Sequence, residues 1–182
     1  MRVHDAISRY LLHVTLEKGL SPHTVHAYRR DLERYVCWVQ GQGIEFVSAI
    51  NASAAIAHAR WLAEAPETGG AGLAARSRQR HISSIRGLHR WLVLEGHCDI
   101  DPWADVTVAA PSRQLPHALA VDDVLALLDA VAVPDPSPTD LRNAALLELL
   151  YGTGARISEV VGLDVDDIDE ADRSVVLRGK GG

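Results

Sequence analysis

Apolar residues recur at helical spacing along the first part of the chain. One run spans residues 5–18 and is followed by Gly19, a residue type that often ends a helix. A second run spans residues 22–41, with Ser21 as a favoured N-cap and Pro22 at the first helical position. The pattern predicts two amphipathic helices. Their inward positions are Ile7, Tyr10, Leu11, Val14, Val25, Tyr28, Leu32, Tyr35, Val36 and Val39.

Two more helical runs follow these. The third begins at Asn51 or Ser53 and stops before the glycine-rich residues 67–72, and the fourth spans about residues 74 to 94. Four helices within residues 1–100 predict a compact bundle. The expected inward positions are Ile56, Ala59, Leu62 and Ala63 in the third helix, and Ile82, Ile85, Leu88, Trp91 and Leu92 in the fourth.

Residues 101–117 interrupt this pattern. Pro102, Pro111 and Pro116 cannot continue a helix, and apolar periodicity is weak, so we expect an extended linker between two domains. The predicted organisation is a helical domain over residues 1–100, the linker, and a second domain over residues 118–182.

The second domain begins with helical patterns and then changes character. Helices are predicted over residues 121–131 and 139–151, with Val124, Leu127, Leu128, Leu146, Leu149 and Leu150 inward. A short helix at 156–162, a strand at 163–165 and a β-branched run at 174–178 follow. The predicted fold is therefore mainly α, ending in the start of a mixed α/β domain.

Composition indicates an ordinary folded protein. Apolar residues make up 47% and charged residues 23% of the chain, which is enough apolar material for a packed core. The first residues contain no apolar leader, and no run approaches the roughly 18 apolar residues of a transmembrane helix. We therefore expect a cytoplasmic protein. Cys37 and Cys98 form no metal or redox spacing and are expected to be buried free thiols.

Charge is distributed unevenly along the chain, whose net charge is −6. Residues 1–113 contain 13 Lys and Arg and 11 Asp and Glu, a net charge of +2. Residues 114–182 contain 5 and 13, a net charge of −8. A surface that binds DNA is therefore expected mainly in the first part of the chain.

Residues 152–159, Gly-Thr-Gly-Ala-Arg-Ile-Ser-Glu, contain the most informative candidate chemistry. The two glycines free the backbone where Arg156 opens a helix, and a guanidinium beside unpaired backbone N–H groups is well placed to hold a phosphate. Taken alone, Arg156 could equally be a surface arginine in a turn between helices. Lys180 lies between Gly179 and Gly181, and such a lysine is by itself usually just solvated.

Together these segments resemble the start of the catalytic domain in tyrosine recombinases of the Xer type, within the phage integrase family. In both, a helix is followed by Gly-x-Gly-x-Arg-x-Ser-Glu, a short helix, a strand, an acidic turn and a strand ending in Gly-Lys-Gly. The separation of Arg156 and Lys180, 24 residues, also fits the family. Upstream, residues 20–32 resemble the second helix of its core-binding domain and residues 101–119 its interdomain linker.

The resemblance implies a clamp around DNA: a four-helix, SAM-like core-binding domain on one face of the duplex and the catalytic domain on the other. In the family, a tyrosine attacks the scissile phosphate, which gives a 3′-phosphotyrosyl link and a free 5′-hydroxyl without metal or nucleotide cofactor. Arg156 would bind a non-bridging oxygen, and Lys180 would protonate the leaving oxygen. Glu159 would orient the site through Arg156.

The resemblance also implies partners and a biological role. The expected partners are double-stranded DNA and a second recombinase of the same family, in a heterotetramer on DNA. The expected function is site-specific DNA recombination, with resolution of chromosome dimers as its role.

The sequence departs from the family pattern after Lys180. The family's His-x-x-Arg pair, its second His or Trp and its nucleophilic Tyr belong downstream of that lysine, and they do not occur before Gly182. We therefore expect a C-terminally truncated recombinase that binds DNA and holds only part of the active site. The four tyrosines all precede Arg156, and each is expected on a helical core stripe; they are Tyr10, Tyr28, Tyr35 and Tyr151.

A basic face for DNA is predicted on the second and fourth helices. Arginine suits phosphates and guanine edges alike, and small polar residues let a helix approach the DNA backbone. An ordinary solvated face is the alternative interpretation. The candidate DNA-binding residues are His26, Arg29, Arg30, Arg76, Ser77, Arg78, Arg80, Arg86 and Arg90.

Several other motifs fail on inspection. Residues 164–169 lack the third ligand and the glycine of a calcium loop, residues 152–154 lack the third glycine of a dinucleotide fingerprint, and Lys180 lacks the following Ser or Thr of a P-loop. No metal or other cofactor is expected. Two functional alternatives stay open: a DNA-binding module without catalysis that occupies or competes for a recombination site, and a helical protein-interaction domain.

Overall fold

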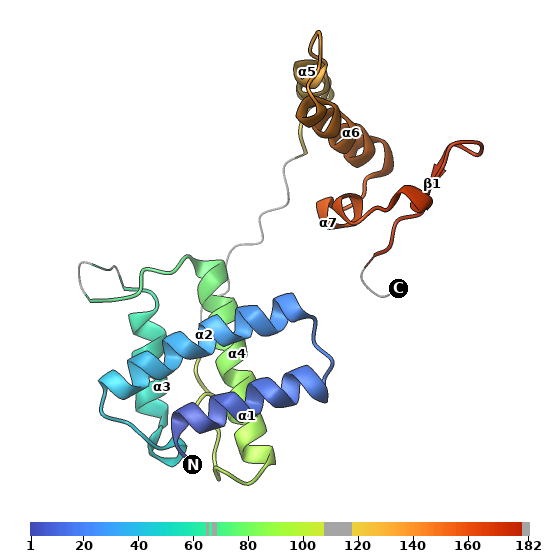
Figure 1. The fold of residues 1–182 in the computed structure, drawn as a ribbon. Helices are drawn as coiled ribbons and strands as arrows, with labels where there is room; N and C mark the ends of the chain where they lie inside the picture. Colours follow the sequence, from blue (N-terminus) through green and yellow to red (C-terminus); the bar gives the residue numbers. More distant parts are fainter. Residues whose placement is uncertain (65, 67–68, 108–117, 180–182) are drawn as a thin grey trace. The chain divides into compact units, whose positions relative to one another are not determined.

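Four helices form the first unit of the chain, residues 1–113 (Figure 1). They are α1 (Val3–Leu16), α2 (Pro22–Gly41), α3 (Ala52–Trp61) and α4 (Ala75–Leu94). The structure is a computed structural model that describes residues 1–64, 66, 69–107 and 118–179. Within the first unit, α1 and α2 lie side by side and both contact α4.

Side chains at the helix starts explain where these helices begin. Ser21 Oγ accepts the backbone N–H of Thr24 at 3.4 Å, and Pro22 follows as the first residue of α2, as predicted. Asn51 Oδ1 accepts the N–H of Ala54 at 2.9 Å, so α3 begins directly after Asn51. The N-caps in the sequence therefore locate both helix starts.

The core of the first unit confirms the predicted inward face of α4 but only part of that of α3. The five predicted positions of α4 are all buried. Ile56 of α3 is 58% exposed, and Ala63, in the turn after this helix, is also exposed, so both predictions were wrong. Ala55 and His58 are buried in their place. The inward face of this short helix is thus rotated by one residue from the predicted one.

The residues after α4 also differ from the expected extended path. Trp103 is fully buried and Val106 nearly so, and both belong to the core of the first unit. Asp101 Oδ1 accepts the backbone N–H of Trp103 at 2.9 Å, which fixes a tight turn around Pro102. This turn directs the Trp103 indole back into the core. Helical periodicity could not predict this burial, because the segment is not a helix.

A set of polar side chains lies inside the same core. His58 Nε2 and His81 Nε2 are 3.2 Å apart, and His81 Nδ1 is 3.4 Å from Asp31 Oδ1. Elsewhere in the core, His89 Nε2 is 2.9 Å from the Tyr35 hydroxyl. Burial lowers the pKa of His58 to about 3 and that of His89 to about 4, so both rings are neutral inside the protein.

The second unit, residues 114–182, contains α5 (Val121–Val131), α6 (Pro138–Thr153) and α7 (Ile157–Val161), followed by a small hairpin. Strand β1 (Ile168–Asp169) pairs antiparallel with β2 (Ser174–Val175), with Ile168 opposite Val175. The predicted strand at 163–165 was wrong, because residues Val165–Asp167 form a 3-10 turn. The N–H of Asp164 donates to Asp167 Oδ2 at 3.0 Å and stabilises this turn.

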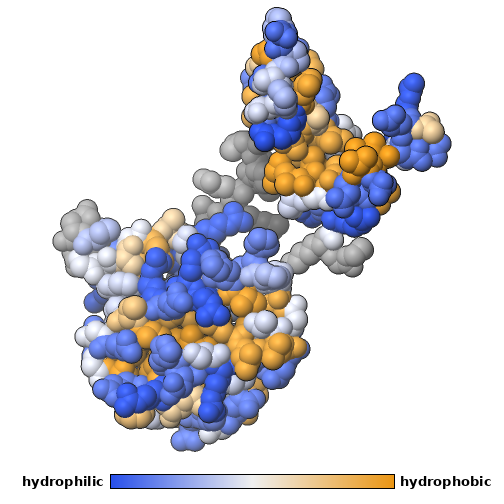
Figure 2. Space-filling model, viewed as in Figure 1, coloured by the Kyte–Doolittle hydropathy of each residue, from blue (hydrophilic) through white to orange (hydrophobic). Residues whose placement is uncertain are grey.

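Apolar side chains of the second unit lie largely on its surface (Figure 2). Among its described residues, Val160 is the one buried hydrophobic side chain. Leu127, predicted to face inward, is 50% exposed, whereas Leu146, Leu149 and Leu150 are half-buried. The helices form where predicted, but their apolar faces are only partly covered.

Candidate nucleic-acid interface

Arg156 lies in the turn between α6 and α7. Helix α6 ends at Thr153, and its C-cap Gly154 has a φ of 65°, the left-handed conformation that favours glycine. Two residues later, Arg156 is the N-cap of α7. The Arg156 side chain is 75% exposed. The predicted Gly-x-Gly-x-Arg turn therefore presents a guanidinium to solvent.

Glu159 holds Arg156 through both of its carboxylate oxygens. Oε2 accepts the Arg156 backbone N–H at 2.9 Å, and Oε1 accepts a guanidinium N–H at 2.7 Å. The backbone N–H of Arg156, and then its guanidinium, lower the pKa of Glu159. Because Glu159 already caps this backbone N–H, the guanidinium, rather than the end of the short helix, is the group left to bind a phosphate.

Gly179 lies directly against this pair. A Cβ at position 179 would be 3.2 Å from Glu159 Oε1, so a larger residue would crowd the carboxylate. Gly179 is bonded to Lys180, which lies outside the described residues. The chain after β2 therefore returns to the Arg156–Glu159 pair one residue before the predicted lysine.

An ion pair between a buried carboxylate and an exposed arginine holds the segment that makes this return, and sequence analysis missed it. Asp167 is 5% exposed, and its oxygens lie 2.6 and 3.2 Å from the two Nη atoms of Arg178. The Asp167 carbonyl also accepts the N–H of Val176 at 2.8 Å. The sequence analysis interpreted Asp167 only as part of an acidic turn. Its partner Arg178 lies 11 residues later, on the other side of the hairpin.

The predicted DNA-binding residues of the first unit lie on α2 and α4. Some of their side chains are exposed to solvent, and others form hydrogen bonds or ion pairs within the protein. His26, Arg29, Arg30, Arg76 and Arg90 are exposed, and Ser77 is half-buried. None of the arginines among these residues forms an ion pair with another described residue.

Three arginines of α4 instead contact the protein itself. Arg78 donates to the Leu73 carbonyl at 2.6 Å, and Arg80 pairs with the buried Asp31 at 3.0 Å. Arg86 donates to the Val106 carbonyl. Their guanidinium groups are thus fixed by the fold, and each has N–H donors left over because a guanidinium carries five.

Comparisons with known proteins decide the family. Residues 7–96 match the phage integrase N-terminal SAM-like domain, and residues 117–182 match the phage integrase family. The chain belongs to the phage integrase family. A tyrosine recombinase XerD of Mycobacterium tuberculosis is 46% identical over 176 residues, which are 95% of this chain and 57% of that protein. A tyrosine recombinase XerC of Pseudomonas fluorescens is 38% identical over 96% of this chain and 56% of its own length.

The chain is also similar to a solved structure. The integrase from mycobacterium phage Brujita aligns with a TM-score of 0.49 and 22% identity, over 96% of this chain and 54% of its own. The chain thus spans a little over half the length of the relatives that it matches.

The four tyrosines differ in burial between the two units. Tyr10 and Tyr35 are buried in the first unit and Tyr28 is half-buried there, as expected of core positions. Tyr151 is 54% exposed, so its predicted core position was wrong. The cysteine prediction was wrong for Cys37, which is exposed, while Cys98 is half-buried.

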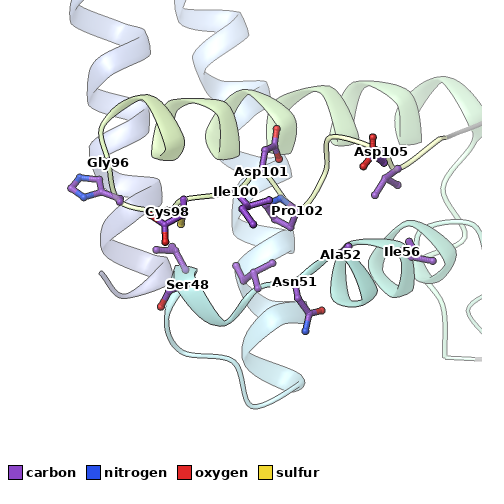
Figure 3. Close-up of a pocket in the computed structure, with 15 residues that line it drawn as sticks. Ser48, Asn51, Ala52, Ile56, Gly96, Cys98, Ile100, Asp101, Pro102 and Asp105 are labelled. Carbon is purple, nitrogen blue, oxygen red and sulfur yellow. The ribbon is translucent and has the colours of Figure 1, made fainter.

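A hollow of about 550 Å³ on the first unit does not suit a phosphate. It opens between the start of α3 and the segment after α4, where Figure 3 shows Asp101 and Asp105 beside Ile56 and Ile100. Asp99 also lines it, whereas no described Lys or Arg does. Three carboxylates would repel an anion, so this acidic hollow is not part of a DNA-binding surface.

Neither a metal site nor a membrane-spanning helix occurs among the residues that the structure describes. No group of His, Cys, Asp or Glu in that part of the chain has a geometry that could hold a metal ion. No helix in it is both long and apolar enough to cross a membrane.

Proposed function

We propose that this chain is the DNA-binding portion of a site-specific recombinase, and that it supplies Arg156 and Lys180 to the reaction at the scissile phosphate. Membership of the phage integrase family supports the reaction class, and relatives named tyrosine recombinase support the substrate. One observation carries the assignment of the two cations. Gly179, the residue before Lys180 in the sequence, lies against Glu159, which holds Arg156.

The chemistry explains why two fixed cations are needed. When a nucleophile attacks a phosphodiester, negative charge builds on the non-bridging oxygens, and preorganised donors stabilise it without the cost of reorganisation. Arg156 meets that charge with a planar donor group that Glu159 orients. Lys180 donates the proton that the leaving 5′-oxygen takes up, a step that contributes ~10²–10⁴ to the rate.

The proposal includes the partner of the recombinase and its biological role. The recombinase acts with a second recombinase of the family at a short site on duplex DNA, as a heterotetramer, and resolves chromosome dimers. The names of the XerD and XerC relatives support such a pairing.

The binding of Arg156 to phosphate can be tested with a matched pair of variants. Arg156→Ala should weaken the affinity of the chain for a nicked duplex about tenfold, because one charge-assisted contact is lost. Arg142→Ala removes an equal charge from an exposed site of the same unit, where Arg142 donates a hydrogen bond to Asn143 Oδ1, and should change affinity less than about twofold. Equal effects of both variants would refute the role of Arg156.

A nicked suicide substrate tests the division between binding and catalysis. Tyr10, Tyr28 and Tyr35 belong to the first unit and are buried or half-buried, so we expect the chain to bind this DNA without a covalent adduct. An adduct that Tyr151→Phe abolishes would instead identify Tyr151 as a nucleophile. Binding without an adduct is also what the alternative, a DNA-binding module, predicts for this chain.

A further inference from the structure

A second hollow, of about 510 Å³, opens on the first unit where α1, α2 and α4 meet. Three cations line it: Lys18, just after α1, and Arg86 and Arg90 on α4. Gln79, Ser83 and Tyr28 add neutral hydrogen-bonding groups. Among the residues that the structure describes, no carboxylate lines this cationic hollow, in contrast to the acidic hollow of Figure 3.

Helix periodicity produces the α4 side of the cationic hollow. Gln79, Ser83, Arg86 and Arg90 are spaced by four, three and four residues, so they form one continuous face of the helix. Neighbouring positions of the same helix, including Ile82 and Leu92, are buried in the core. Because the core fixes the rotation of α4, the polar row is held in place beside α1 and α2.

The cations of the hollow have donors available. Lys18 and Arg90 form no ion pair with any residue that the structure describes. Arg86 gives one N–H to the Val106 carbonyl, and its Nε is buried without a hydrogen-bond partner among the described residues. A buried donor without a partner is costly, so an acceptor entering the hollow could stabilise this arrangement.

Gly87 allows a hydroxyl to form part of the floor. A Cβ at position 87 would lie 2.3 Å from the Tyr10 hydroxyl oxygen, so only glycine permits that oxygen to approach α4 so closely. Burial raises the pKa of Tyr10 to about 12, and the nearby Tyr28 contributes to this shift. The Tyr10 hydroxyl is therefore a neutral donor at physiological pH.

We propose that the cationic hollow binds one phosphate group of a DNA backbone, with Lys18 and Arg90 as its main cations and Ser83 and Tyr28 as neutral donors. This inference rests on the proposed DNA binding and specifies where one phosphate contact is made. Cations together with Ser, Tyr and Gln side chains are the groups that proteins use for DNA phosphates. The proposed DNA-binding surface thereby includes Lys18, just after the end of α1, whereas the sequence predicted this surface on α2 and α4 alone.

The test compares charge-removing variants inside and outside the hollow on a duplex of arbitrary sequence. Lys18→Gln and Arg90→Gln should each weaken binding about tenfold. Each should also reduce the dependence of log affinity on log salt by about one. Arg9→Gln makes the same charge change at an exposed position of α1 that does not line the hollow, and it should change affinity less than about twofold.

A variant without charge change separates the hollow from general electrostatics. Ser83 is exposed, so Ser83→Leu should leave the fold intact while it fills the hollow with apolar atoms. It should weaken DNA binding about tenfold. Circular dichroism and urea unfolding of all variants check that the first unit stays folded.

The outcomes distinguish this inference from the proposed function. If the wild-type chain binds DNA but Lys18→Gln and Arg90→Gln behave like Arg9→Gln, the hollow is not a phosphate site and DNA binding stands. If the wild-type chain does not bind duplex DNA at all, the proposed function itself falls. If Lys18→Gln and Arg90→Gln weaken the binding of inorganic phosphate but not that of the duplex, the hollow binds a free anion instead, and the assignment to the DNA backbone is wrong.

Discussion

The two units carry similar helical patterns of apolar residues but bury them to very different extents. In the first unit, the predicted stripes of α1, α2 and α4 meet in one core that also takes in Trp103 and Val106. In the second, α5 and α6 have no buried residue, and Leu125, Leu127 and Tyr151 are about half exposed. Periodicity therefore predicts where a helix forms, but a buried face needs a second surface to cover it.

This difference bears on function. A closed core holds Arg86 and Arg90 in a fixed row, whereas in the second unit local contacts between described residues orient Arg156 and the hairpin beside it. Those contacts are the Glu159 cap on Arg156 and the ion pair of Asp167 with Arg178. Binding can therefore rely on the whole fold of the first unit, while the Arg156 site relies on two carboxylates.

The largest expected effect comes from matched leucine truncations in the two units. Leu32 is fully buried and Leu127 is half exposed, so Leu32→Ala should lower the free energy of unfolding by about 2–5 kcal/mol and Leu127→Ala by less than about 0.5 kcal/mol. Urea unfolding followed by circular dichroism measures both. Comparable losses would show that the second unit is as well packed as the first.

Acid should destabilise the first unit selectively. The folded protein holds His58 and His89 at pKa values of about 3 and 4, below the value of about 6.5 in an unfolded chain. The unfolded state therefore binds more protons below about pH 6.5, and stability, fully present above that pH, falls as the pH drops. At about pH 5 the loss is about 2 kcal/mol for each histidine.

This pH dependence can be followed by tryptophan fluorescence, since all four tryptophans lie in the first unit. His89→Gln should remove about half of the dependence, and His4→Gln, at an exposed position of α1, should leave it unchanged. A stability that does not vary between about pH 5 and 7 would contradict the buried neutral histidines.

A smaller effect is expected in the hairpin of the second unit. Arg178→Ala leaves the buried Asp167 carboxylate without its cation, and because Arg178 is itself exposed we expect a local loss of about 1–2 kcal/mol. Hydrogen exchange of the Val176 amide, which donates to Asp167, should become faster. Unchanged exchange would mean that this ion pair does not hold the hairpin.

The smallest effects concern helix caps and compare the two units directly. Ser21→Ala and Ser137→Ala each remove an N-cap hydroxyl, from α2 and α6, and should cost about 1 kcal/mol of helix stability. Because the core holds α2, the stability lost in Ser21→Ala should appear as a lower free energy of global unfolding. The stability lost in Ser137→Ala should instead appear as faster hydrogen exchange at the frayed start of α6. The reverse pattern would contradict the difference in packing.

Local signals in the sequence predicted much of this structure. Ser21, Pro22 and Asn51 located helix starts because caps act over three residues, and the inward face of α4 followed its spacing. The prediction of a strand at 163–165 was wrong, because the hydrogen bond from the Asp164 N–H to the Asp167 carboxylate stabilises a turn there against the β propensity of these residues. The buried path of Trp103 depends on tertiary packing, which no local pattern encodes.

The candidate site was partly predictable as well. Asp31 lies on the inward stripe of α2, four residues before Tyr35, so its spacing was a signal of burial that its charge concealed. Arg156 and Glu159 were found from the motif, but the hydrogen bonds from Arg156 to both Glu159 oxygens and the approach of Gly179 required coordinates. Lys18 was missed because α1 carried no cluster of cations in the sequence.

The most direct test of DNA binding is the affinity of the chain for a duplex as a function of salt. If about six phosphates are neutralised, the affinity should fall by ~10³ or more between about 50 and 200 mM salt. This steep, roughly log-linear decline is the predicted result. An affinity that does not change with salt would contradict a DNA-binding surface built from these arginines and Lys18.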